Sequence, residues 1–423
     1  MTQRFDRYSK RKPRCAWSAT RSKWKHVQRG LTLGMVRTDY LPFGKPNFSE
    51  AEIEAVTAVM RSGWIGMGAL TQAFEAELAA YLGAPHVVCV NSCTSALFLA
   101  LKVHGVGPGD EVICPSLTWL SSANAGLYLG ATPVLCEVDH ETLCVTPQTV
   151  AAKLSPRTKA VVVVHFGGLA ADVAALRAVL PPHVAIVEDA AHALGSQYPG
   201  GSMVGASGNL VCFSFYANKN LSTGEGGAVA CADAAVAERL RSLRLHALPD
   251  DAWKRFSHPR VMIKVEAAEL GYKMNYTDLQ AAIGRIQLQR QAEFHTTRLA
   301  VAEIYCERIA QSGLPLKTQP GVLDPGHSRH LFLIRIPAAG RLPHRDEVLL
   351  ALRDRNVGAT LHYDPLHGMP LYCTEGSDAA DSAGFPITEE ICHEILTLPI
   401  SASMDVADAA YVADQLLDIL GAR

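Results

Sequence analysis

The sequence predicts an α/β protein with a mostly parallel central sheet sandwiched by helices, followed by a smaller α+β domain. Short apolar runs alternate with helical patterns between about residues 87 and 213. Such alternation is typical of parallel sheets that are buried on both faces. From residue 291 onward, helical patterns surround a single strand-like run at 330–336. The 423 residues are enough for both parts.

We therefore divide the chain into a basic leader at 1–38, a large sheet domain at 39–290 and a small domain at 291–423. Residues 1–34 hold ten Lys and Arg against one acid, which gives the leader +9 and the remainder about −11. The leader lacks the apolar core of a secretory signal. We expect it to be disordered and inessential, with Met35 an equally good start. An arm that binds nucleic acid or a membrane surface is the alternative.

Two helices are expected before the first strand. Ser49 and Glu52 have the spacing of a capping box, and apolar residues then recur at helical spacing, so the first helix covers about 50–62. The second helix covers about 70–82. The glycine-rich loop 62–68 between them suits either a tight turn or a binding lip.

The alternation then supplies the sheet. Its expected strands are the apolar runs 87–90, 111–114, 132–135, 160–164, 184–187 and 210–213. Ligands of open parallel sheets bind at the carboxyl ends of the strands. The polar and aromatic residues after these runs therefore form one candidate rim: Thr94, Trp119, Asp189, His192 and Ser214, with Lys219 beyond them.

The later part of the chain is mostly helical. Residues 271–284 read as a polar loop that runs into a helix, and a long helix then extends to about residue 310. Further helical patterns reach about residue 420.

The eleven cysteines contain no C-x-x-C pair and no cluster with His at metal-ligand spacing. Neither a zinc site nor a disulfide framework is indicated, and many cysteines lie in apolar runs, as buried thiols do in a reducing compartment. We expect a cytoplasmic protein. No uncharged apolar run reaches 18 residues, so we expect no membrane insertion, and we expect no nucleic-acid partner.

Lys219 is the most informative single residue. It follows the apolar run 210–213 and precedes a glycine-rich stretch, 224–227, where a strand gives way to a tight loop. A desolvated lysine with a lowered pKa attacks an aldehyde and later acts as a base. Most lysines are surface charges, so this interpretation depends on what surrounds it.

The surrounding residues supply what an aldehyde cofactor requires. The polar turn 91–95, before a helix expected at 96–103, is a candidate phosphate site because free N–H groups and the helix dipole favour anions. Asp189, at the end of a buried run, is the candidate partner of a ring nitrogen. Trp119 offers a surface for a ring. Ordinary helix capping by the Ser and Asp residues and a core position for Trp119 are the alternatives.

With these residues together, the chain resembles the DegT/DnrJ/EryC1/StrS family of sugar aminotransferases from about residue 41 to its C-terminus. The motifs that carry the resemblance are Ser-Gly-Trp-Ile-Gly (62–66), Asn-Ser-Cys-Thr-Ser-Ala-Leu (91–97), Pro-Ser-Leu-Thr-Trp (115–119), Glu-Asp-Ala-Ala-His-Ala (188–193), Ser-Phe-Tyr-Ala-Asn-Lys-Asn (214–220), Gly-Glu-Gly-Gly (224–227) and Gly-Tyr-Lys-Met-Asn-Tyr (271–276). The resemblance implies the aspartate-aminotransferase fold, which is fold type I of the pyridoxal-phosphate enzymes, with the cofactor in the large domain.

The resemblance also implies catalytic roles. Lys219 carries pyridoxal 5'-phosphate covalently, Asp189 pairs with its pyridinium nitrogen, His192 lies near its ring hydroxyl, and Trp119 stacks on its ring. A dehydrating branch of the family has histidine in place of the lysine, so Lys219 favours transamination.

Four further residues are implied to hold the cofactor phosphate. Cys93, Thr94 and Ser214 come from the same chain. Asn275 reaches the phosphate from a neighbouring subunit, which implies a homodimer with shared active sites.

The reaction implied is transfer of an amino group from L-glutamate, which leaves as 2-oxoglutarate, to a nucleotide-linked keto-sugar for polysaccharide or glycosylated-metabolite synthesis. Motifs 115–119, 141–147 and 156–161 are most similar to enzymes that make UDP-4-amino-4-deoxy-arabinose, and 361–367 is similar to perosamine-type synthases. Two alternatives stay open: amination of a keto-cyclitol with glutamine as donor, and a regulatory or sensory protein that keeps the cofactor without turnover.

Overall fold

The computed structural model describes residues 36–248, 269–338, 340–372 and 384–421. Nearly all of the basic leader lies outside these residues, so its disorder and dispensability stay predictions. None of the helices in the described ranges combines the length and apolar character needed to cross a membrane. Within the same ranges, no group of three or more His, Cys, Asp and Glu could hold a metal ion.

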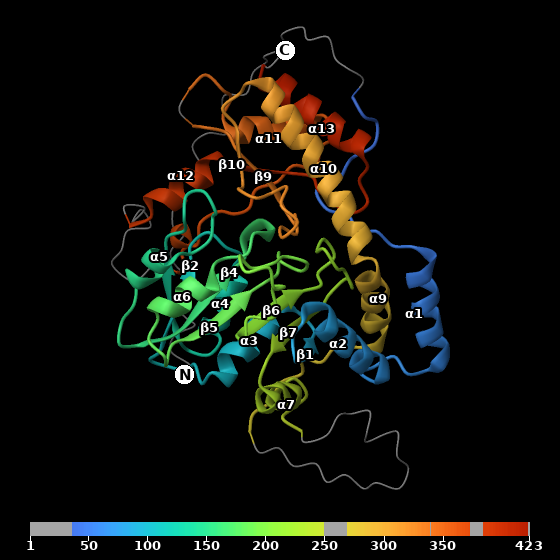
Figure 1. The fold of residues 1–423 in the computed structure, drawn as a ribbon, viewed down its shortest axis with the longest axis vertical. Helices are drawn as coiled ribbons and strands as arrows, with labels where there is room; N and C mark the ends of the chain where they lie inside the picture. The colour runs from blue at the N-terminus through green and yellow to red at the C-terminus, as the bar shows by residue number, and fades with distance from the viewer. Residues whose placement is uncertain (1–35, 249–268, 339, 373–383, 422–423) are drawn as a thin grey trace, which may run out of the picture. The chain divides into compact units, whose positions relative to one another are not determined.

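Two sets of elements follow each other along the chain (Figure 1). The first set is α1 (Glu50–Ser62), α2 (Ala69–Leu82), β1 (His86–Val90), α3 (Cys93–Val103), β2 (Glu111–Pro115), α4 (Ser121–Leu127), β3 (Thr132–Cys136), α5 (Pro147–Ala151), β4 (Thr158–Val164), α6 (Val173–Val179), β5 (Ala185–Asp189), β6 (Leu210–Ser214), β7 (Gly227–Cys231), α7 (Ala234–Leu243) and α9 (Asp278–Gln289). The second set is α10 (Gln291–Ser312), β8 (Lys317–Thr318), β9 (Phe332–Arg335), α11 (Arg345–Asp354), α12 (Pro386–Glu394), β10 (Ile395–Leu398) and α13 (Val406–Ile419).

The central sheet has seven strands in the order β1-β7-β6-β5-β4-β2-β3. The pairs from β6 to β3 are parallel, whereas β7 is antiparallel to both β6 and β1. The predicted fold class, a mostly parallel sheet in an α/β protein, is confirmed. A second sheet, β10-β9-β8, is antiparallel and belongs to the later part of the chain.

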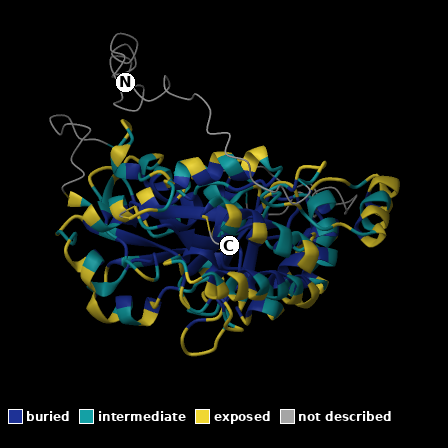
Figure 2. Ribbon diagram, turned by 90° about the horizontal axis from the view of Figure 1, so that it is seen from above, coloured by how far each residue is buried: buried dark blue, intermediate teal, exposed yellow. Residues whose placement is uncertain are grey.

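Both faces of the central sheet are buried, as the continuous apolar runs require. In β4, Val161 and Val163 pack with apolar residues of α2, α6 and α9, while Ala160 and Val162 pack with those of α3, α4 and α7. Figure 2 shows the buried strands in the interior, with exposed residues on the outer faces of the helices. Strands β1, β2, β4, β5 and β6 run in the same direction, so their carboxyl ends reach one edge of the sheet.

Most predicted boundaries agree with the structure to within two residues, but three expectations need correction. Helix α3 begins at Cys93 rather than Ala96, because Ser92 is its N-cap and the Ser92 Oγ accepts a hydrogen bond from Ser95 N–H at 3.1 Å. Strand β7 was not predicted, because its glycine and alanines have little strand propensity. After residue 291 a single strand was expected, whereas β9 is flanked by β8 and β10 in a three-stranded sheet. Helices α9 and α10 meet at Arg290, where the boundary between large and small domains is predicted.

Candidate active site

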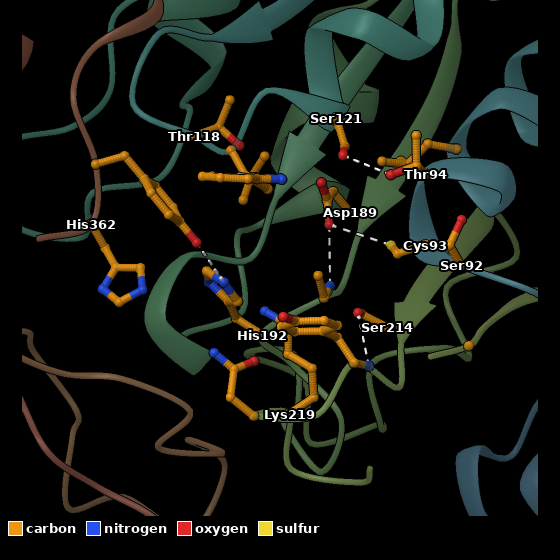
Figure 3. A pocket seen from close by; sticks show the side chains of 18 of the residues that line it. Ser92, Cys93, Thr94, Thr118, Ser121, Asp189, His192, Ser214, Lys219 and His362 are labelled. Carbon is orange, nitrogen blue, oxygen red and sulfur yellow. Dashed lines mark hydrogen bonds between the residues drawn. The ribbon is translucent and has the colours of Figure 1, made fainter. Parts of the chain in front are cut away.

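A cavity of about 410 Å³ lies at the carboxyl-terminal edge of the central sheet (Figure 3). Its size is in the range of small-ligand and cofactor sites. Seven predicted site residues line it: Cys93, Thr94, Trp119, Asp189, His192, Ser214 and Lys219. The topology brings them together from segments more than 120 residues apart.

Lys219 lies on the loop between β6 and β7, where its backbone N–H donates to Tyr216 O at 2.9 Å. Its side chain is partly buried and enters the cavity. Burial lowers the pKa of Lys219 to about 8, although the nearby Asp189 and Cys93 oppose this shift. The neutral, nucleophilic form of the amine is therefore much more populated near neutral pH than that of an ordinary lysine.

Asp189 is the last residue of β5 and is 5% exposed. Its Oδ2 accepts a hydrogen bond from Ser122 Oγ at 2.7 Å, and its Oδ1 accepts one from Ala191 N–H at 3.1 Å. Burial raises the pKa of Asp189 above its ordinary value, while these two hydrogen bonds and Lys219 oppose the rise. A buried carboxylate held in this way favours a cationic partner inside the cavity.

The N-terminus of α3 forms one wall of the cavity. Thr94 Oγ1 lies 2.7 Å from Ser121 Oγ, and Ser214 Oγ accepts from Tyr216 N–H at 3.4 Å (Figure 3). Gly227 allows β7 to approach this wall, because a Cβ there would lie 2.6 Å from Ser92 C and 2.7 Å from Cys93 N. Hydroxyl groups and the first N–H groups of a helix are suited to a phosphate.

His192 has an assignable tautomer. The N–H of Gly167 points at His192 Nδ1 at 3.4 Å, so Nδ1 is an acceptor and Nε2 carries the proton. Nε2 then donates to the Tyr363 hydroxyl at 3.1 Å. Burial, Lys219 and His362 all lower the pKa of His192 well below its ordinary value, so the ring is neutral.

Trp119 is the most exposed of the predicted residues, with 56% of its surface accessible. Its ring centroid lies 5.6 Å from that of Tyr363, and the two ring planes are inclined at 49°. The indole therefore lines the mouth of the cavity as a surface that a flat ring can contact. Stacking on the cofactor stays a prediction.

Asn275 does not line this cavity. Its Nδ2 donates to Tyr276 O at 3.1 Å, and its backbone bridges to Val90 at the end of β1. The expectation that Asn275 serves a neighbouring subunit stays a prediction.

Sequence reasoning missed several residues of the site. Ser122 holds Asp189, Tyr363 contacts His192, and His330 Nε2 lies 3.3 Å from Lys219 Nζ. The sequence offered a signal for Tyr363, which lies in the family-like motif 361–367. For His330 the only signal was a histidine at the start of an apolar run, which core histidines also show.

These residues fit pyridoxal 5'-phosphate. The cavity contains an amine of lowered pKa for the aldehyde, a buried carboxylate for the ring nitrogen and a helix N-terminus for the phosphate.

Comparison with known proteins identifies relatives along most of the chain. The model of the DegT/DnrJ/EryC1/StrS aminotransferase family matches residues 46–417. The spore coat polysaccharide biosynthesis protein SpsC of Bacillus subtilis (strain 168) is 41% identical over 388 residues, which are 91% of this chain and 98% of that protein.

Solved structures agree. The putative sugar aminotransferase Spr1654 from Streptococcus pneumoniae, in its PMP form, has a TM-score of 0.83 and 28% identity, covering 90% of this chain and 99% of its own. The aminotransferase TlmJ from Streptoalloteichus hindustanus has a TM-score of 0.80 and 36% identity, covering 90% and 98%. Spr1654 is also known in a PLP form. The chain therefore belongs to the DegT/DnrJ/EryC1/StrS aminotransferase family, and it is an enzyme that uses pyridoxal 5'-phosphate to transfer amino groups.

Proposed function

We propose that the enzyme transfers the amino group of L-glutamate to the ketone of a nucleotide-linked 4-keto-sugar, and that it works in the cytoplasm as a homodimer. The 41% identity to SpsC, named for spore coat polysaccharide biosynthesis, supports a sugar substrate, as does the likeness to the putative sugar aminotransferase Spr1654. The products are 2-oxoglutarate and an amino sugar for a polysaccharide or a glycosylated metabolite.

The observation that carries the reaction type is the Lys219 amine. It lies in the cavity that also contains the Asp189 carboxylate, and its pKa of about 8 leaves it able to accept a proton near neutral pH. General bases are most effective when their pKa is close to the working pH. Retention of both residues favours an enzyme over a regulatory protein that binds the cofactor without turnover.

Each residue of the cavity then has a task. The bound cofactor supplies an electron sink. Asp189 would hold the proton on the ring nitrogen, and Ser214, Thr94 and the N-terminus of α3 would hold the phosphate. Lys219 Nζ would take the proton from the α-carbon of glutamate and, in the second half-reaction, deliver one to the carbon that becomes the amine-bearing carbon of the sugar.

The test follows nitrogen from donor to product. The purified enzyme is incubated with ¹⁵N-glutamate and, in separate reactions, with UDP-4-keto-pentose, a nucleotide-linked 4-keto-hexose and a keto-cyclitol, and products are identified by mass spectrometry. We expect ¹⁵N in an amino sugar, formed in equal amount with 2-oxoglutarate. Lys219→Ala should abolish the transfer, whereas Lys317→Ala, which alters an exposed lysine of β8, should not.

The other outcomes contradict the proposal in different ways. Label found only in an aminocyclitol, or only when ¹⁵N-glutamine replaces glutamate, would overturn the substrate or donor assignment. Cofactor bonded to Lys219 without transfer to any acceptor would favour the regulatory alternative.

A further inference from the structure

The Lys219 amine makes a hydrogen bond to a residue that is distant in the sequence. His330, just before β9, places Nε2 3.3 Å from Lys219 Nζ. His330 is 2% exposed, and its ring lies against that of His192 with centroids 4.5 Å apart. The imidazole is therefore fixed in position next to the amine.

A pair of glycines lets the segment before β9 reach the cavity. The N–H groups of Ser328 and Leu331 donate to Gly168 O at 3.2 Å and to Gly167 O at 3.0 Å. At Gly168, φ is +114°, and a Cβ would lie 2.5 Å from Ser328 Oγ and 3.1 Å from His330 N. Only glycine allows this approach, so the backbone itself fixes the position of His330.

The tautomer of His330 follows from the amide beside it. Asn220 Nδ2 donates to Ser328 O at 2.9 Å, and since a carbonyl only accepts, the amide cannot be flipped. Asn220 Oδ1 therefore faces His330 Nδ1, at 3.2 Å, and this contact requires the proton on Nδ1. The Nε2 atom is then an unprotonated acceptor, and Lys219 Nζ must be the donor.

Burial keeps His330 in this neutral state. Burial and the nearby Lys219, His192, Arg298 and His362 lower the pKa of His330 well below its ordinary value. The groups that face the Lys219 amine are Asp189 from β5, Cys93 from α3, and the histidines His192, His330 and His362. Among these groups, His330 is the one whose hydrogen bond with Nζ is described above.

We propose that His330 is a positioning residue: its unprotonated Nε2, fixed by Asn220, holds the Lys219 amine whenever that amine is not bonded to the cofactor. This inference rests on the assignment of Lys219 as the cofactor lysine. The hydrogen bond gives the amine a defined position for proton transfer, instead of leaving it free to move as the bonds of its four-carbon side chain rotate. No covalent step is assigned to His330.

The first test uses apoenzyme and the pH dependence of cofactor capture. Wild type, His330→Leu and His330→Gln are mixed with pyridoxal phosphate at a series of pH values, reduced with borohydride, and the modified Lys219 peptide is quantified. A hydrogen bond to Nε2 favours the charged amine, so its loss should move the midpoint below the wild-type value in His330→Leu. In His330→Gln the amide oxygen can accept the same hydrogen bond, so the midpoint should return to the wild-type value.

The second test uses glutamate deuterated at the α-carbon in single-turnover experiments. If the loss of His330 leaves Lys219 poorly placed, proton transfer slows by about 10- to 100-fold. The isotope effect on the half-reaction should then rise in His330→Leu. It should return to the wild-type value in His330→Gln. A purely structural role for His330 would lower the amount of loaded enzyme and leave the isotope effect unchanged.

The outcomes separate this inference from the proposed function. Suppose that His330→Leu still traps the cofactor on Lys219, but that its capture midpoint is unchanged or raised and its isotope effect is unchanged. This result would overturn the positioning role alone. Failure to trap the cofactor on Lys219 in the wild type would overturn the assignment of Lys219 itself. A ¹⁵N-histidine spectrum of the apoenzyme that shows His330 protonated at Nε2 would also contradict the proposal.

Discussion

At the scale of single residues, the site depends on two ionisable groups whose environments oppose their usual charges. Burial lowers the pKa of Lys219 to about 8 and raises that of Asp189, while each group favours the charge of the other. Ser122 and the N–H of Ala191 limit the rise for Asp189. Groups tuned in this way are typical of active sites, because a base must be free of its proton near the working pH.

A pH prediction follows for the apoenzyme. The amine must be neutral to attack the aldehyde, so covalent capture of pyridoxal phosphate should rise with pH and level off above about 8. The negative charge of Asp189 raises the pKa of Lys219, so Asp189→Asn should move the midpoint to lower pH. Stopped-flow absorbance of the lysine-bound cofactor measures the midpoint.

Asp354→Asn, at an exposed aspartate that ends α11, is the matched control and should leave the midpoint in place. A midpoint near the ordinary lysine value in the wild type, or a rise in Asp189→Asn, would contradict the electrostatic account of this site.

At the scale of elements, the packing of β7 against the start of α3 shapes the cavity. Strand β7 runs antiparallel between β6 and β1 and presents Gly227 to the backbone of Ser92 and Cys93. The Ser92 cap starts α3 at the rim, which leaves the first N–H groups of the helix directed at the cavity. Gly227, in the glycine-rich stretch 224–227, thus serves the close approach of two backbones.

Gly227→Ala tests this packing. A methyl group would have to displace backbone atoms 2.6 to 2.7 Å away, so we expect a loss of about 1–3 kcal/mol in the free energy of unfolding and a weaker affinity for pyridoxal phosphate. Urea unfolding and cofactor titration measure the two effects. Gly107→Ala, where a Cβ meets no atom within 4 Å, is the control. Equal stability and affinity in both variants would show that the approach of β7 does not shape the site.

At the scale of the whole molecule, Asn275 points to an assembly. The residue lies next to β1 but does not line the cavity of its own chain. The family resemblance implies that Asn275 holds the cofactor phosphate of a neighbouring subunit, and this role requires a second copy of the chain. Two-fold homodimers are the commonest assemblies of this kind.

Hybrid enzymes test the shared site. Lys219→Ala removes the amine, and Asn275→Asp would place a negative charge next to the phosphate, so each variant alone should be inactive. Unfolding and refolding them together in equal amounts should restore roughly a quarter of the wild-type activity, because half of the random dimers contain one intact site. The reference is a mixture of Lys219→Ala and Lys317→Ala chains. In this mixture only the sites that keep Lys219 should be active. Absence of any restored activity would place Asn275 outside the partner's site.

The sequence by itself determined the fold class and the positions of Lys219 and Asp189, because continuous apolar runs require a sheet buried on both faces and their ends must share an edge. Local signals also placed Ser92 and Thr94 in the polar turn before a helix, although that helix begins at Cys93 rather than at Ala96. Only the tertiary structure decided that His330 meets Lys219, across 111 residues. That contact depends on the left-handed backbone of Gly167 and Gly168 and on the orientation of the Asn220 amide, and no periodicity or spacing in the sequence encodes either.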